Sequence, residues 1–167
     1  MSQPTTRPPR RLSGFTMVEL ITVLLVVGIM AAVAMPRLNP SGFDAPGYRD
    51  KVRATLEFAR KSAIAQRRIV CVTLAANGLA LTIDNVTRET VAGRGTCPRE
   101  LTLPATEGTC AGTNAICAPN ANVVLTGPLV LTFDPLGRAS AASYLYTVGD
   151  AMMSLPVNVV AETGYVR

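Results

Sequence analysis

A single carboxylate, that of Glu19, lies near the start of the most apolar stretch of the chain, residues 15–35. Placing a charged side chain inside a bilayer costs about 2.5–3.5 kcal/mol even on the lowest scales, so a segment that only holds a chain in a membrane has no reason to carry one. A segment that later leaves the lipid and packs against copies of itself can use the acid, because a charge in apolar surroundings must be paired. Glu19 is therefore the first candidate for a functional residue.

The other titratable residues give little support to catalysis. The chain of 167 residues contains no histidine, which excludes a Ser-His-Asp or Cys-His arrangement. It has no Gly-Lys-Ser/Thr loop to hold a phosphate and no zinc-binding helix motif. Its eleven acidic residues form no suggestive cluster along the sequence. We therefore expect a protein that is not an enzyme and that has no cofactor.

Four cysteines are the remaining candidates for covalent or metal chemistry: Cys71, Cys97, Cys110 and Cys117. An even number of cysteines outside the cytoplasm suggests two disulfides, for which three pairings exist. Cys110 and Cys117 are close enough in sequence to close a small loop, and Cys71 would then pair with Cys97. Zinc is the competing interpretation, but the chain has no Cys-x-x-Cys pair and no histidine. We favour disulfides or free thiols over a metal site.

Residues 15–35 are long enough to cross a membrane as a helix. At about 1.5 Å per residue they reach about 30 Å, the thickness of the hydrocarbon core of a bilayer. Three arginines precede the segment, Arg7, Arg10 and Arg11, and the positive-inside rule keeps that end in the cytoplasm. The long C-terminal part then lies across the membrane, which in a bacterium is the oxidising periplasm. We expect a single-pass protein of the bacterial inner membrane.

Two simpler explanations fit this segment less well. A secretory signal peptide has a shorter apolar core and a cleavage site after that core, whereas here the polar break precedes the apolar run. An ordinary single-span anchor explains the length of the run, but it explains neither Glu19 nor the junction between Gly14 and Phe15.

The sequence GFTMVEL at residues 14–20 resembles the cleavage and methylation site of type IV prepilins and of the pseudopilins of type II secretion. The resemblance implies that prepilin peptidase cuts between Gly14 and Phe15, and that Phe15 becomes an N-methylated amino terminus. It also implies that Glu19 aligns a subunit with the amino terminus of its neighbour during filament assembly. Pro36 lies where many pilins carry a proline that loosens the helix.

The C-terminal part resembles one group within this superfamily, the GspH/FimT group. Residues 131–139 (LTFDPLGRA) are similar to its Phe-x-Pro-x-Gly strand–turn signature, residues 58–68 to its helix-to-strand passage, and residues 162–164 to its C-terminal end. The resemblance implies a minor pilin or minor pseudopilin, which helps to initiate assembly of a type IV pilus, an MSHA-like pilus or a type II secretion pseudopilus. The partners implied are other pilin subunits, prepilin peptidase, the inner-membrane assembly platform and membrane lipid.

Some FimT-like members resemble DNA receptors that use a basic Gly-Arg-x-Arg end, so a DNA- or surface-binding tip pilin is the alternative function. The matching residues here are Gly164-Tyr165-Val166-Arg167. Tyr165 replaces the first arginine of that pattern, and only Arg167 matches. An aromatic side chain such as that of Tyr165 can still stack on a base.

Four further arginines are candidates for contact with DNA or phospholipid, because they lie on one stripe of a predicted helix: Arg49, Arg53, Arg60 and Arg67. The alternative is a solvated helix flank whose arginine stems cover apolar surface. We favour this alternative, because Asp50 and Glu57 dilute the positive field and no aromatic residue is interleaved for base stacking. The formal charge of +5 is weak evidence for a polyanion, since the leader arginines contribute three of these charges.

The elements that must position these residues follow from the apolar pattern. The chain divides into a cleaved leader at 1–14, a transmembrane and assembly helix at 15–35, a linker at 36–47 and a periplasmic globular domain at 48–167. The linker is predicted from its three prolines and two glycines. Residues 48–68 resume a helical period, with one face that should cover a sheet: Val52, Leu56, Ala59 and Ala63.

The rest of the globular domain is predicted to be β-structure. Residues 69–84 predict a hairpin, since two β-rich runs flank Asn77-Gly78, a pair that favours a two-residue type I′ loop. Further strands are predicted at 123–125, 129–134, 139–148 and 157–161, with a turn at 134–137 and possible short strands near 88–92 and 99–103. A helix followed by antiparallel strands predicts an α+β fold with the helix packed on one side of the sheet.

Overall fold

The structure, a computed structural model of the whole chain, describes residues 15–34, 40–75, 77–85, 96–105, 110, 112–140 and 143–167. The predictions for the leader, for Pro36 and for a strand near 88–92 lie outside these residues. The chain divides into two compact units, Met1–Asn39 and Pro40–Arg167.

The first unit contains the helix α1 at Met17–Ala34. Apart from Glu19, Thr22 and Gly28 its residues are apolar, so the helix has no polar face. The side chains of residues 15–32 are all exposed. Within the described part of the chain, no helix combines the length and the apolarity needed to cross a membrane.

The second unit begins with a 3-10 turn, η2 at Pro40–Phe43, which leads directly into the helix α2 at Asp44–Gln66. The helix therefore starts four residues before the predicted position and shortens the predicted linker. Pro46 lies in its first turn, where a backbone N–H has no helical partner, so the proline does not interrupt it. The helix ends at Gln66 because Arg67 adopts a left-handed conformation, with φ of 52°, that closes the last turn.

In the described residues of this unit, eight strands form two antiparallel sheets. The first sheet has the order β3-β2-β1-β6, with β4 also paired to β2. Its strands are β1 Val70–Ala75, β2 Gly78–Ile83, β3 Arg99–Glu100, β4 Ala115–Cys117 and β6 Val130–Phe133. The second sheet has the order β5-β7-β8, with β5 at Val124–Thr126, β7 at Ser143–Gly149 and β8 at Ser154–Val160.

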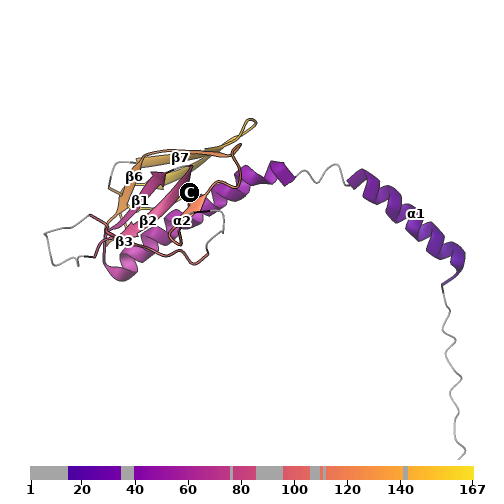
Figure 1. Cartoon of the computed structure of the whole chain (residues 1–167), viewed down its shortest axis with the longest axis horizontal. Coiled ribbons are helices and arrows are strands. Elements are labelled where there is room, and N and C mark those ends of the chain that lie inside the picture. The colour runs from indigo at the N-terminus through magenta and orange to yellow at the C-terminus, as the bar shows by residue number, and fades with distance from the viewer. Residues whose placement is uncertain are drawn as a thin grey trace, which may run out of the picture. The chain divides into compact units, whose positions relative to one another are not determined.

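Helix α2 runs along one side of the sheets and contacts β1, β7 and β8 (Figure 1). The face predicted to cover a sheet is fully buried at Val52, Leu56, Ala59 and Ala63. It belongs to one buried apolar core with side chains of both sheets, among them Val72, Leu81, Phe133, Tyr146 and Val157. The predicted α+β layout, with the helix on one side of antiparallel β-structure, is confirmed.

The predicted hairpin is present, but its loop lies one residue earlier than expected. Ala75 pairs with Gly78, so Gly78 is the first residue of β2 and not part of the loop. A side chain at Gly78 would collide with the carbonyl oxygen of Ile116 in the neighbouring strand β4. The glycine is therefore needed for the close approach of β4, while Asn77 supplies the left-handed turn residue with φ of 63°.

Several strand boundaries also differ from the predictions. The predicted strand near 99–103 contains only two strand residues, and β4 was not predicted. The predicted strand at 139–148 is shorter, because Ala139 forms only an isolated bridge with Phe133 and β7 begins at Ser143. Strand β8 begins three residues early and includes Pro156. A proline is tolerated in β8 because this strand lies at the edge of the β5-β7-β8 order.

Candidate functional site

The structure describes the predicted processing site from Phe15 onwards, and its first two described residues lie before α1. Phe15 and Thr16 precede α1, and the phenyl side chain of Phe15 is exposed. The Thr16 hydroxyl accepts a hydrogen bond from the backbone N–H of Glu19 at 3.2 Å, and the Thr16 carbonyl accepts one from Leu20 at 3.2 Å. Thr16 is thus the N-cap of α1. Phe15 therefore lies outside the helix.

Sequence reasoning overlooked this capping role, although its signal is present. The spacing of Thr16 and Glu19 is that of a capping box, in which a Ser or Thr is followed three residues later by Glu or Gln. The acid lies in the first turn of α1, where the partial positive charge of the helix N-terminus favours a carboxylate. In the described part of this unit Glu19 is exposed and makes no ion pair, so its carboxylate is open to an external cation.

The first two arginines of the predicted stripe are engaged within the globular unit. Arg49 forms an ion pair with Asp50 at 3.1 Å and donates to the carbonyl oxygen of Pro156 at 3.4 Å. Arg53 forms an ion pair with Glu57 at 3.3 Å. Both arginines are therefore engaged in local contacts.

Arg60 and Arg67 have structural positions of a different kind. Arg67 is the left-handed cap residue that ends α2. The stem of Arg60 lies beside two glycines from distant parts of the chain, Gly137 and Gly164. A side chain at Gly164 would overlap the carbonyl oxygen of Gly137 and would lie 3.2 Å from Cδ of Arg60. The Nε atom of Arg60 is buried and has no hydrogen-bond partner among the described residues.

Arg60 therefore connects the two C-terminal sequence signatures. Gly137 ends the turn at 134–137, in which the Asp134 carboxylate accepts hydrogen bonds from the backbone N–H groups of Leu136 and Arg138 at 2.9 and 2.8 Å. Gly164 is the last residue of the C-terminal signature at 162–164. The two motifs were recognised separately in the sequence, and the fold places them in direct contact.

The C-terminal residues form a short additional edge beside β8. Arg167 and Asn158 exchange two backbone hydrogen bonds of 2.9 and 2.8 Å, and Val166 is buried opposite Val159. Tyr165 and Arg167 flank this buried residue and are exposed. Of the residues considered for nucleic-acid contact, these two are exposed together in one segment, and neither belongs to the ion pairs of Arg49 and Arg53.

The structure contains two disulfides and uses all four cysteines. Cys71 of β1 is bonded to Cys97, with their Cα atoms 6.1 Å apart, and Cys110 is bonded to Cys117 of β4, with 5.7 Å between Cα atoms. This pairing is the one that the spacing suggested. Both bonds fix the long segment between β2 and β5 to the first sheet.

Comparison with known proteins gives one family match and solved structures of similar fold. Residues 9–35 match the family model described as the prokaryotic N-terminal methylation motif. No curated protein sequence matches the chain.

Two solved structures resemble the fold. The type IV minor pilin FimU of Pseudomonas aeruginosa PAO1 is 14% identical, with a TM-score of 0.55 over 76% of this chain and 89% of that chain. The minor pseudopilin EpsH from the type 2 secretion system of Vibrio cholerae is 13% identical, with a TM-score of 0.52 over 74% of this chain and 94% of that chain. At these identities the likeness shows a shared fold.

Proposed function

We propose that this chain, which joins an N-terminal methylation motif to the fold of minor pilins and pseudopilins, is a minor structural subunit of a type IV pilus or of a type II secretion pseudopilus. The observation that carries the proposal is the motif at residues 9–35, which includes the apolar residues of α1. The motif and the fold were recognised independently, and both point to the same superfamily. Neither the motif nor the fold favours one of the two filament systems over the other.

In this proposal, prepilin peptidase removes the leader after Gly14 and Phe15 becomes the N-methylated amino terminus. The capped start of α1 keeps Phe15 outside the helix, which supports access to this position. Residues 15–35 hold the subunit in the inner membrane until assembly, with the globular unit in the periplasm. An oxidising compartment of this kind supports the formation of the two disulfides.

Glu19 then sets the alignment of the subunit in the filament. Its carboxylate is exposed in α1 and pairs with the positively charged amino terminus of a neighbouring subunit. An unpaired carboxylate among apolar helices is costly, so this pairing gives a strong directional preference. The apolar side chains of α1 supply the packing energy between subunits. We assign no catalytic step to the chain.

Mass spectrometry of the protein from its native host tests the proposal directly. We expect the loss of residues 1–14 and one added methyl group on Phe15. The variant Gly14→Glu should retain the leader and remain in the membrane fraction. An intact leader on the wild-type protein, with no assembled filament, would contradict the proposal.

A second function, binding of DNA or a surface at the filament tip, is favoured by the joint exposure of Tyr165 and Arg167. A gel shift with double-stranded DNA at low salt tests it, and Arg167→Ala should weaken binding with a reduced dependence on salt. Arg53→Ala is the matched control, since Arg53 is paired with Glu57. The absence of a shift at low salt would leave the structural function alone.

A further inference from the structure

Three large apolar side chains stand out by their exposure in the described part of the globular unit. Phe43 and Leu129 are each 72% exposed and Met152 is 94% exposed, whereas the next, Leu145, is 54% exposed. Single apolar residues scattered over a surface need no explanation, but apolar residues gathered at one place indicate a contact. The positions of these three side chains in the fold therefore matter.

Phe43 and Met152 lie at the same end of the unit, the end where α2 begins. Phe43 immediately precedes α2. The side-chain amide of Asn120 donates a hydrogen bond to the Asp44 carboxylate at 2.7 Å, which joins the segment before β5 to the start of the helix. Two residues later, Asn122 lines a surface hollow together with residues of the turn between β7 and β8, the turn that carries Met152. Figure 1 shows the tip of this hairpin at the same end of the unit as the start of α2.

Leu129 belongs to this end as well. Its carbonyl oxygen accepts a hydrogen bond at 2.8 Å from the backbone N–H of Leu74, close to the turn of the first hairpin. Tyr48, in the second turn of α2, donates from its hydroxyl to the carbonyl oxygen of Asn77 in that hairpin turn. Three separate segments therefore meet where α2 begins, and each presents one exposed apolar side chain. We call Phe43, Leu129 and Met152 the apolar end.

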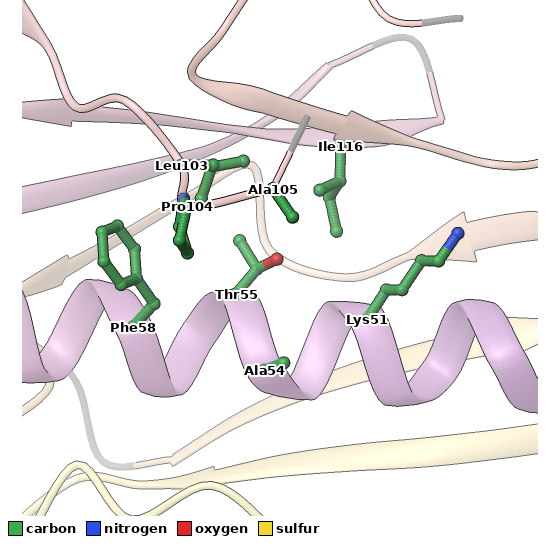
Figure 2. Close-up of a pocket in the computed structure, with 8 residues that line it drawn as sticks. All are labelled: Lys51, Ala54, Thr55, Phe58, Leu103, Pro104, Ala105 and Ile116. Carbon is green, nitrogen blue, oxygen red and sulfur yellow. The ribbon is translucent and has the colours of Figure 1, made fainter. Parts of the chain in front are cut away.

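The apolar end is distinct from the apolar hollow farther along α2. This hollow of about 180 Å³ lies between Ala54 and Phe58 of the helix and the segment 103–105 (Figure 2). None of the three residues of the apolar end lines it. The apolar end thus consists of protruding side chains, which suit insertion into a fluid surface.

The length of the connecting chain keeps the apolar end near a bilayer that holds α1. Five residues, 35–39, join Ala34 at the end of α1 to Pro40 at the start of η2. A chain of this length spans at most about 20 Å when it is fully extended. The four residues of η2 then end at Phe43. Whatever the course of the connecting residues, the start of α2 cannot move far from the bilayer surface.

The charges at this end suit a lipid surface without net charge. Residues 44–51 of α2 contain two acidic and two basic side chains, of which Arg49 and Asp50 are paired. Residues 118–133 contain no charged side chain, and residues 143–160 contain Asp150 alone. At the other end of α2, residues 60–68 contain four basic side chains and no acid. An anionic surface would therefore attract that other end, and the start of α2 depends on apolar insertion.

We propose that the apolar end inserts into the periplasmic surface of the membrane that holds α1, before the subunit enters a filament. The partner is the interface of a zwitterionic lipid bilayer, which takes up aromatic and apolar side chains at the depth of the head groups. The contact is weak in isolation and becomes effective because α1 holds the unit at a high local concentration at the surface. This inference rests on the proposed function, which places α1 in the membrane.

Single tryptophans test the insertion, because the chain contains none of its own. The full chain is reconstituted into phosphatidylcholine vesicles that contain lipid brominated in the acyl chains, which quenches tryptophan on contact. The fluorescence of Phe43→Trp and of Met152→Trp should fall at least about twofold, since an indole ring at the interface lies beside the lipid. Leu136→Trp is the matched control, because Leu136 is also exposed and apolar but its turn lies against the other end of α2. Quenching of the two variants no stronger than that of Leu136→Trp would overturn the proposal.

Flotation of the same vesicles separates the possible failures. A chain that does not float with the vesicles would contradict the membrane placement of α1, and with it the proposed function. A chain that floats while Met152→Trp stays unquenched overturns the insertion alone. Emission of Met152→Trp at shorter wavelength without quenching would mean that protein covers the apolar end, which overturns lipid as the partner.

Two further comparisons test the assigned residues and charges. In the Met152→Trp chain, the changes Phe43→Ser and Leu129→Ser together should weaken the quenching at least about twofold, because binding scales with the inserted apolar area. Leu145→Ser, a change within β7, should leave the quenching as it was. An equal effect of both sets of changes would overturn the joint insertion. Quenching should also stay the same when about a third of the lipid is anionic, and a large increase would assign the contact to the basic end of α2 instead.

Discussion

At the scale of single residues, Asn77 connects three parts of the globular unit. Its side-chain amide donates to the carbonyl oxygen of Val123 and accepts from the N–H of Leu125, and its backbone carbonyl accepts from the Tyr48 hydroxyl at 2.9 Å. One turn residue thus joins α2, the first hairpin and the edge of β5. The sequence predicted a turn at Asn77 from local chemistry, but its partners lie 46 and 48 residues away and leave no local signal.

We expect Asn77→Asp to destabilise the globular unit by about 1–3 kcal/mol, because the donor to Val123 is replaced by an oxygen that faces another oxygen. The left-handed turn itself should tolerate aspartate. The measurement is urea unfolding of residues 40–167 at neutral pH. Asn85→Asp is the matched control at an exposed position, and it should change the stability by less than about 0.5 kcal/mol. Equal effects at both positions would refute the connecting role of Asn77.

For Tyr146 we expect a substitution to have the opposite effect on stability from that at Asn77. Its hydroxyl is buried without a hydrogen-bond partner among the described residues, and burial, with a smaller contribution from Tyr144, raises the pKa of Tyr146 above its usual range. Because the folded-state pKa is raised, the wild-type unit should lose stability as the pH rises above about 10, where the unfolded tyrosine ionises.

Tyr146→Phe should therefore be as stable as the wild type or more stable at neutral pH, and its stability should fall less above pH 10. Thermal unfolding between pH 7 and 11 measures both effects. Tyr165→Phe, at an exposed position, should follow the wild type. A clear loss of stability for Tyr146→Phe at neutral pH would mean that the hydroxyl has a partner.

At the scale of elements, the end of α2, the turn at 134–137 and the C-terminal end meet at Gly137, Gly164 and Arg60. The two glycines have φ of 79° and 60°, which favours glycine at both positions. Their close approach explains in physical terms why the strand–turn signature and the C-terminal glycine occur together in one chain.

Gly164→Ala should destabilise the unit by more than about 2 kcal/mol, because the added methyl group overlaps the carbonyl oxygen of Gly137 and the backbone is strained. Gly47→Ala is the contrasting control. Gly47 lies in the first turns of α2 with nothing within 4 Å of an added methyl group, so alanine should stabilise the helix by about 0.5–1 kcal/mol. Chemical unfolding of both variants checks the expected loss of stability for Gly164→Ala and the expected gain for Gly47→Ala. An unchanged stability of Gly164→Ala would contradict the close packing.

Local sequence patterns predicted some of these elements correctly and missed others. The buried face of α2 followed from helical spacing alone, since Val52, Leu56 and Ala59 recur at that period. Strand β4 could not be predicted, because its three residues are held by pairing with β2 and by the Cys110–Cys117 disulfide. The early start of α2 was also missed. Pro46 counted as one of the linker prolines, but a proline is compatible with the first turn of a helix, and the sequence alone does not show that the helix begins at Asp44.

At the scale of the whole molecule, three of the described sheet edges are partly covered or charged. The side chain of Asn77 covers β5, the C-terminal residues cover part of β8, and the edge strand β3 consists of the charged pair Arg99 and Glu100. Such features prevent unwanted strand addition. Pairing of strands between copies is therefore disfavoured at these three edges.

Under the proposed function, we expect α1 to direct incorporation into a filament and Glu19 to be its main side chain in this role. The variant Glu19→Gln retains the backbone N–H that donates to Thr16, so the start of the helix should be unchanged. It removes the charge that would pair with the amino terminus of a neighbour. We expect normal cleavage and folding but at least about tenfold less protein in the filament fraction, which corresponds to a loss of only about 1.4 kcal/mol.

Immunoblots of sheared filaments and of membranes from the native host measure this partition. Glu162→Gln, which removes an exposed acid from the globular unit, should leave it unchanged. If Glu19→Gln enters filaments at the wild-type level, apolar packing of α1 is sufficient for alignment and the carboxylate has no registering role. If only Glu19→Gln remains in the membrane after normal cleavage, alignment requires the charge, since apolar packing and the fold of the globular unit are the same in both variants.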